Sequence, residues 1–366
     1  MNWLRFGCRA RPYEVVAAAF GFGSTLLILP SGLEFSAPLA WGFAIKVVEY
    51  SLLVFAAAAM VILIRASRSV SGEGFIPAAR AAAGKYLTME YVSLTFRRVV
   101  SILAVFYFFV HIKNLIPLVH PVSYDRLYWD LDRIIHLGWQ PNVGLMLALG
   151  DIHSITVTVD WLYIKFFSYM MVASLVFLSE AGGLKLAERY VFAFCLLWAA
   201  GGIAYFAAPA DGPCYAALRD HAVSPRDRAH LLAQPLIKDA PVEYARAYER
   251  SKIWIAKAYQ ERLWKSRKAF LIDGRQPGVF YGIAAMPSLH VAAVALIALF
   301  LWPVSRWLGV VGYAYLAVML FGSALLQWHY LVDGYAGLAL AWAAWVMSRY
   351  GTGHAALTYG GDGGRP

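Results

Sequence analysis

The sequence has 366 residues, of which 60% are hydrophobic and 15% are charged, and its formal net charge is +10. Soluble globular domains are roughly 45–50% apolar and about 25% charged, so this composition excludes an ordinary soluble protein. Several windows approach the roughly 20 apolar residues that a membrane-spanning helix needs. The sequence therefore predicts an all-α fold, a polytopic membrane helical bundle.

The apolar runs predict about eight transmembrane helices. In chain order they are Val15–Leu33, Val47–Ile64, Val99–Val119, Thr158–Ser179, Tyr190–Ala208, Ala285–Trp302, Gly309–Trp328 and Leu331–Ser348. The first run lacks a small-residue cleavage site, so we expect a retained helix rather than a removed signal peptide. The three cysteines match neither a disulfide framework nor a metal-ligand spacing.

Basic residues indicate how these spans are oriented. With eight spans, the two termini and the even-numbered connections share one side, and the short connections on the other side carry little beyond Lys46, Arg126 and Arg133. Because short basic loops stay inside, we expect both termini in the cytoplasm and the long loop Pro209–Ile283 outside. A bacterial-type cytoplasmic (inner) membrane is the expected location.

The connections divide the chain into three predicted parts. Residues 1–98 form a two-span segment with a basic cytoplasmic loop, and residues 99–350 form the main membrane domain, with the outer loop 209–283 inserted. Residues 351–366 form a Gly-rich tail that we expect to be disordered. Residues 121–152 are too polar for a span yet rich in aromatic side chains, which favours a re-entrant or interfacial segment.

The outer loop contains the stretch "PVEYARAYERSKIWIAKAYQERLWKSRKAF". Its apolar residues recur at helical spacing, with arginine and lysine between them: Tyr244, Tyr248, Ile255, Tyr259, Leu263 and Phe270. This pattern predicts an amphipathic helix that lies on the membrane surface. A basic face also suits nucleic acid, but an aromatic stripe beside eight spans argues against it, so no nucleic-acid partner is expected.

Three ionisable residues gather at the ends of one predicted helical hairpin. His290 opens the run 285–302, and the chain returns along 309–328 to His329. Because the two spans have similar lengths, both histidines should lie at the same outer face. Asp333 follows His329 by four residues, which places both side chains on one helix face. Since ionisable groups in a membrane are costly and usually functional, the trio is the candidate catalytic site.

These residue types suit phosphoryl transfer. Pro287 fits the first helical turn, and the free N–H groups of that turn, with the Ser288 hydroxyl, would form an anion site. His290 could donate a proton to a leaving oxygen. Asp333 could hold His329 in one tautomer, which leaves His329 free to attack phosphorus. These are the parts that transfer through a phosphohistidine requires.

At these residues the sequence resembles the type 2 phosphatidic acid phosphatase (PAP2) superfamily. The family pattern is Lys-x6-Arg-Pro, then Pro-Ser-Gly-His, then Ser-Arg-x5-His-x3-Asp. Here Pro287–His290 reads Pro-Ser-Leu-His, and His329–Asp333 supplies the final His-x3-Asp. The resemblance implies a six-helix membrane core in which His329 is the nucleophile, Asp333 its partner and His290 the proton donor. It implies no metal and no cofactor.

Two elements of that pattern depart from the family. Leu289 replaces the glycine, and Gly322-Ser323 stands where Ser-Arg would be, so the arginine that clamps the phosphate is absent. The first element has a partial counterpart in residues 268–277, where Lys268 and Arg275 are followed by an extra glutamine before the proline. Because a cation must neutralise the phosphoryl oxygens, Ser288, Arg275 and Lys268 are the expected phosphate-binding residues. Lys113 and Lys165, near the ends of their spans, are the alternative candidates for the phosphate-binding cation.

These departures resemble the inositol phosphorylceramide synthase (inositolphosphotransferase-like) branch. The segments "YFAAPADGPCY" at 205–215 and "LDRIIHLGWQP" at 131–141 also look like that branch. The branch implies transfer of a phosphorylated headgroup from a lipid to an acceptor alcohol. The expected partners are therefore a lipid phosphate substrate and an alcohol acceptor or water, whereas the sequence leaves the lipid and the oligomeric state open.

Two other functions remain open at this point. His290, His329 and Asp333 are also a legitimate zinc-ligand set, which would make the protein a metal-dependent membrane hydrolase. Alternatively, the trio could gate or bind a solute in a non-enzymatic transporter, for which Lys113, Lys165 and His111 within spans are the support. Activity that survives chelation excludes the first alternative, and inactivity on a panel of lipid phosphates favours the second.

Overall fold

The computed structural model describes residues 10–68, 75–218, 237–273 and 282–351. These residues form helices joined by short connections, with no strand among them. The helices are α1 (Pro12–Ile28), η1 (Leu29–Ser31), α2 (Ala37–Arg68), α3 (Phe75–Tyr86), α4 (Met89–Val119), α5 (Asp125–Ile135), α6 (Pro141–Leu149), α7 (His153–Ile164), α8 (Phe166–Leu178), α9 (Leu184–Ala207), α10 (Pro213–Ala216), α11 (Val242–Arg250), α12 (Ile255–Asp273), α13 (Leu289–Leu301), α14 (Arg306–Leu325) and α15 (Leu331–Gly351).

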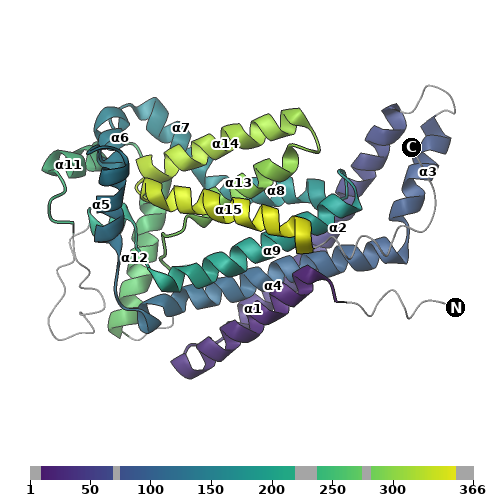
Figure 1. Cartoon of the computed structure of the whole chain (residues 1–366), viewed down its shortest axis with the longest axis horizontal. Coiled ribbons are helices and arrows are strands. Elements are labelled where there is room, and N and C mark those ends of the chain that lie inside the picture. Colours follow the sequence, from purple (N-terminus) through teal and green to yellow (C-terminus); the bar gives the residue numbers. More distant parts are fainter. Residues whose placement is uncertain (1–9, 69–74, 219–236, 274–281, 352–366) are drawn as a thin grey trace.

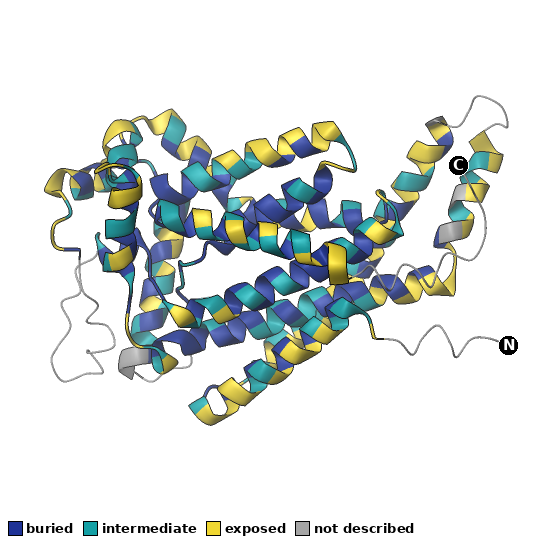
Figure 2. Ribbon diagram, in the orientation of Figure 1, coloured by how far each residue is buried: buried dark blue, intermediate teal, exposed yellow. Residues whose placement is uncertain are grey.

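Six stretches are long and apolar enough to cross a membrane: α1 with η1, α2, α4, α9, α14 and α15. The pair α7 and α8 passes the same test together but is bent by 48° at the break between them. Many large apolar side chains on these helices are exposed, Trp307 and Phe22 among them (Figure 2). Hydrocarbon is the environment that such a surface suits. The prediction of a polytopic helical membrane bundle is therefore confirmed.

The predicted span 285–302 differs in the structure. Its helix, α13, has only 13 residues, and at 1.5 Å per residue it is about 20 Å long, shorter than the roughly 30 Å of a hydrocarbon core. Eleven of those residues are buried. A helix that is apolar on all sides belongs inside a bundle, and α13 lies between α9, α14 and α15 (Figures 1 and 2).

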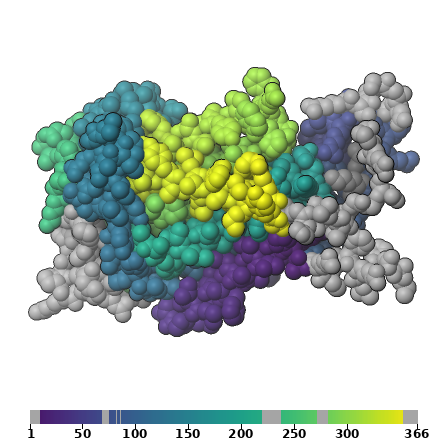
Figure 3. Space-filling view, viewed as in Figure 1, coloured from purple at the N-terminus to yellow at the C-terminus, as the bar shows by residue number. Residues whose placement is uncertain are grey.

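The segment 121–152, expected to be re-entrant or interfacial, forms the short helices α5 and α6. They lie with α11 at one end of the bundle (Figure 1), which we call the site end. The space-filling view shows α5 directly beside the start of α15 (Figure 3), and these two helices contact each other. The segment thus covers the beginning of the helix that carries Asp333.

The stretch of the outer loop that was predicted to form a single amphipathic helix forms two helices, α11 and α12. The Lys257 ammonium donates to the carbonyls of Tyr248, Glu249 and Ser251 just after α11. The Asp160 carboxylate accepts three backbone N–H groups, at 2.7–2.9 Å, at the start of α12. These contacts satisfy the polar groups that a break between two helices exposes.

The aromatic stripe of this loop also faces the protein more than the membrane. Tyr244 is fully buried and Phe270 is buried, whereas Tyr259 is exposed. The Tyr244 hydroxyl donates to the Gln327 side chain, and the Gln260 amide donates to the Leu326 carbonyl at 2.8 Å. The stripe therefore attaches α11 and α12 to the turn between α14 and α15.

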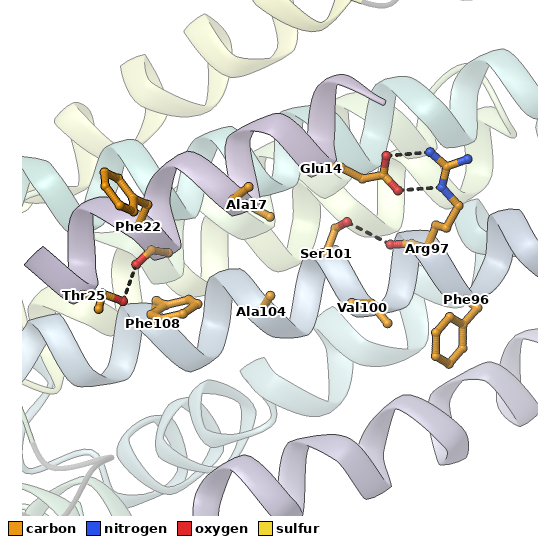
Figure 4. A pocket seen from close by; sticks show the side chains of 12 residues that line it. Glu14, Ala17, Phe22, Thr25, Phe96, Arg97, Val100, Ser101, Ala104 and Phe108 are labelled. Atoms are coloured by element: carbon orange, nitrogen blue, oxygen red, sulfur yellow. Dashed lines mark hydrogen bonds and ion pairs between the residues drawn. The ribbon is translucent and has the colours of Figure 1, made fainter. Parts of the chain in front are cut away.

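Ion pairs hold the opposite end of the bundle together. Arg98 is fully buried and contacts Glu180 at 2.9 Å and Glu188 at 2.7 Å, which connects α4 to α9 and the end of α8. Nearby, the Arg97 guanidinium donates to both carboxylate oxygens of Glu14 at 2.6 Å (Figure 4). This pair closes one end of an open groove of about 530 Å³ between α1 and α4 that contains none of the candidate site residues.

Candidate functional site

His329 and Asp333 form a buried pair where α15 begins. His329 lies in the turn after α14, and Asp333 lies in the first turn of α15. Their nearest atoms, His329 Nδ1 and Asp333 Oδ2, are 3.4 Å apart, and the side chains are 5% and 0% exposed. Asp333 Oδ2 also accepts the Tyr330 N–H at 3.0 Å. The carboxylate thus lies on the Nδ1 side of the imidazole, and the Ala285 backbone also hydrogen-bonds the His329 ring.

His290 faces His329 from the neighbouring helix. It is the second residue of α13, and its ring centroid lies 5.9 Å from that of His329. Three aromatic rings surround it at centroid distances of 5.6, 4.5 and 6.3 Å: Tyr163, Phe166 and Phe167. These rings come from both sides of the break between α7 and α8, so the bend in that span shapes the wall beside His290. Unlike His329, His290 is only half-buried.

The Pro-Ser-Leu-His stretch docks the start of α13 onto α15. The Ser288 side chain accepts the Val291 N–H at 3.4 Å as the N-cap of α13, and the Ser288 N–H donates to the Asp333 carbonyl at 2.9 Å. Gly337 permits this approach, because a Cβ there would lie 2.4 Å from the Ser288 carbonyl oxygen. The sequence suggested that Pro287 lies in the first helical turn. In the structure it instead precedes the N-cap residue Ser288.

Leu289, which replaces the glycine of the family pattern, packs against the neighbouring helix α9. Its side chain is 2% exposed and packs on Gly201 of α9, where a Cβ would come within 2.3 Å of it. The leucine side chain is thus accommodated by a glycine on the neighbouring helix.

Among the described residues, the lysine whose charge acts on both histidines is Lys113, one of the two alternative candidates from the sequence. It lies near the end of α4. Its Nζ lies 5.8 Å from the centre of the Tyr205 ring, and it makes no ion pair with a carboxylate among the described residues. Among the described residues, Lys113 is therefore a cation close to both histidines that no carboxylate neutralises.

Neither Lys268 nor Lys165 is joined to the histidines by a contact among the described residues. Arg275 lies outside the described residues. Lys268 is half-buried on α12, and no contact in the described part of the chain joins it to either histidine. Lys165 is exposed and lies over the Trp161 ring.

The sequence contained a signal for Lys113 that the comparison with residues 268–277 passed over. Lys113 is followed, after six intervening residues, by His120 and Pro121, which reproduces Lys-x6-Arg-Pro with histidine in place of arginine. In the sequence, this match lies far before the Pro-Ser-Leu-His element, whereas residues 268–277 lie just before that element. Allowing another cationic residue type at the arginine position would have found it.

Three polar residues of α5 and α6 support the hairpin, and the sequence did not single them out. Asp132 accepts the N–H groups of Leu331 and Val332, each at 2.8 Å, at the start of α15. Asn142 donates from its amide nitrogen to the carbonyls of Ala324 and His329, each at 3.0 Å.

Asp125 completes this support. It accepts the Tyr330 hydroxyl and the N–H groups of Asp211 and Gly212, each at 2.8 Å. Burial, and after it the neighbouring Asp211 carboxylate, raises the pKa of Asp125, while these donors favour the ionised form. Asp211 in turn pairs with the buried Arg267 of α12. The polar residues of 121–152 therefore hold the turn that carries His329.

The electrostatics favour a neutral His329. Burial, and after it the charges of His290 and Lys113, lowers the pKa of His329 well below the usual value of 6.5. A neutral imidazole has a free lone pair and can act as a nucleophile. Among the described residues, no group of three or more His, Cys, Asp and Glu side chains is arranged to hold a metal ion.

Comparison with known proteins supplies the family. The model of the PAP2 superfamily matches residues 127–347, a stretch that begins in α5, ends in α15 and includes His290, His329 and Asp333. It does not separate the inositolphosphotransferase-like branch from other members. Comparison with curated proteins and with solved structures gives no match. The chain therefore belongs to the PAP2 superfamily, and this membership indicates a membrane phosphatase-type function.

Proposed function

We propose that the protein is an integral-membrane phosphoesterase or phosphotransferase that acts on lipid phosphates through a phosphohistidine at His329. The observation that carries this proposal is the pair of facing histidines, with ring centroids 5.9 Å apart and the Asp333 carboxylate behind one of them. A phosphoryl group between the two rings would have a nucleophile on one side and a proton donor on the other.

In the first step, the imidazole nitrogen of His329 that faces His290 attacks phosphorus. The N–P bond forms while the bond from phosphorus to the leaving oxygen breaks, and His290 gives its proton to that oxygen. Asp333 stabilises the positive charge that the ring acquires. The phosphate that enters the site is an anion, so its arrival favours the protonated form of His290.

Lys113 and the start of α13 supply the positive charge that the phosphoryl oxygens need. The Lys113 ammonium acts on both rings and has no carboxylate partner in the described part of the chain. The first N–H groups of α13 add the positive end of a helix dipole. Ser288 contributes by capping this helix and tying it to Asp333. In this proposal Lys113 takes the role expected of Lys268 and Arg275.

In the second step, an acceptor hydroxyl attacks phosphorus, and His290 takes the proton of that hydroxyl. The new O–P bond forms while the N–P bond breaks, and its electron pair returns to His329, which becomes neutral again. Water as acceptor gives a phosphatase, whereas an alcohol gives an inositolphosphotransferase-like enzyme. The same N–P intermediate serves both. From the positive-inside bias we further propose that the site end faces the outside of a bacterial-type cytoplasmic membrane and that both termini lie in the cytoplasm.

The test is the formation of a phosphoenzyme by purified protein with a lipid labelled in its phosphate. We expect His329→Ala to abolish the label, whereas His153→Ala, at an exposed histidine that begins α7, should keep it. Label that persists in His329→Ala would refute the mechanism. Mass spectrometry of the products, with and without an alcohol such as inositol, then separates transfer to water from transfer to the alcohol.

A further inference from the structure

An apolar cavity of about 200 Å³ lies among α2, α4, α8 and α9. It is lined by Phe43, Tyr50, Val99, Ile102, Leu103, Phe106, Phe167, Met170, Met171, Ser174, Leu178 and Phe194. The Ser174 hydroxyl does not call for a water here, because it donates to the Met170 carbonyl at 2.7 Å and is bonded to the Tyr190 hydroxyl at 2.6 Å. The cavity is thus suited to hydrocarbon rather than to water.

Two elements connect this cavity to the catalytic site. Phe167 lines the cavity, and its ring centroid lies 6.3 Å from that of His290. On α4 the lining residues recur at helical spacing up to Phe106, and Lys113 follows seven residues later on the same face. Seven residues are two turns, or about 10 Å along the helix. The cavity and the site are therefore neighbours along one face of α4.

We propose that this cavity holds one hydrocarbon chain of the substrate whose phosphate lies between His290 and His329. The inference rests on the proposed function and adds where the lipid tail lies. Along α8 the lining runs from Phe167, beside His290, to Leu178, which is about 16 Å of helix. A dry apolar cavity of about 150 Å³ accepts a benzene molecule, so the space here fits a single chain rather than two.

The residues that line the cavity indicate that the N-terminal part of the protein selects the hydrocarbon chain of the substrate. Phe43 and Tyr50 come from α2, and the lining residues of α4 also precede residue 127. Both helices lie outside the region that the PAP2 model matches. His290, His329 and Asp333 thus come from the matched region, whereas two of the four helices around the tail precede it.

The test fills the cavity and compares a long with a short alkyl phosphate, hexadecyl phosphate and butyl phosphate, in the same detergent. Met171→Trp places a larger side chain in the cavity. Val172→Trp is the matched control, because Val172 is the next residue of α8, is 65% exposed and does not line the cavity. We expect Met171→Trp to lower kcat/KM for hexadecyl phosphate by about tenfold, the effect of roughly two methylene groups left unburied. Turnover of butyl phosphate should stay close to that of the wild type.

The outcomes separate this inference from the proposed function. Unchanged preference for the long chain in Met171→Trp, or an equal loss on both substrates, would overturn the cavity assignment alone. A wild-type protein that turns over neither phosphate would overturn the proposed function and the assignment with it.

A second measurement needs no variant and uses the full-length wild-type protein. A long-chain alkyl phosphate with a diazirine near the end of its chain is photolysed on the protein, and the adducts are mapped by mass spectrometry. We expect adducts on α8 and α4 at the lining residues, and excess hexadecyl phosphate should suppress them. Adducts that excess hexadecyl phosphate leaves undiminished would show ordinary bilayer contact and contradict the proposal.

Discussion

Asp132 offers the sharpest test of how the fold positions His329. Its two carboxylate oxygens accept the first two N–H groups of α15, each at 2.8 Å, and its side chain is fully buried. Hydrogen bonds to a charged group contribute about 1.5–3 kcal/mol each. Asp132→Asn has almost the same shape, but its amide has a single oxygen, so one N–H of α15 loses its acceptor. We therefore expect the free energy of unfolding to fall by about 1.5–3 kcal/mol.

The same substitution should slow the chemistry, because Leu331 lies two residues after His329 and two before Asp333. If about half of the lost free energy appears in the positioning of the His329–Asp333 pair, phosphoenzyme formation slows by about 4- to 13-fold. The assay is single-turnover labelling, together with thermal unfolding of the same preparation. Both are measured well below the unfolding temperature of the variant.

Asp160→Asn is the matched control for this experiment. Asp160 holds the start of α12 through three N–H groups, in the way that Asp132 holds α15, but it does not contact the turn that carries His329. We expect a similar loss of stability with a rate of labelling near that of the wild type. The reasoning is refuted if Asp132→Asn is destabilised but labels at the wild-type rate, or if both variants lose the same activity.

Three further predictions concern the charge and composition of the site. Lys113→Gln should slow phosphoenzyme formation by about 10²–10³-fold, since it removes an electrostatic donor to the phosphate. Lys165→Gln, at an exposed lysine, should leave this rate unchanged. Equal rates in the two variants would contradict the assignment of Lys113. Because the pKa of His329 is lowered below 6.5, the ring stays neutral and active on the acid side of that value. Lys113→Gln removes one cause of this lowering, so the acid limb of its normalised pH–rate profile should move to higher pH. Since the substrate ionises identically in both enzymes, an unmoved limb would refute this cause. Exhaustive chelation should leave turnover unchanged, and a loss that zinc restores would instead support a metal-dependent hydrolase.

The sequence alone predicted those features that depend on local composition and short spacing. Apolar runs indicated the membrane bundle because hydrocarbon requires long stretches without charge. The spacing between His329 and Asp333 predicted that the two side chains lie together on one helix face. His329 in fact precedes α15, but its Nδ1 does lie 3.4 Å from Asp333 Oδ2. The Pro-Ser-Leu-His and His-x3-Asp elements indicated the family because both lie within short motifs.

The tertiary structure decided what depends on segments far apart in the chain. Only the packing of α4 on α9, which in turn packs on α13 and α15, brings Lys113 close to the two histidines. Only the structure shows that α13 is shorter than a span and buried on nearly every side. In the sequence, Asp132 and Asn142 are simply polar residues of a connection. Only their hydrogen bonds in the structure show that they hold the turn around His329. The aromatic stripe of α11 and α12 looks the same in sequence whether it faces lipid or protein, since both environments accept an apolar face. Which of the two it contacts is set by its neighbours in space.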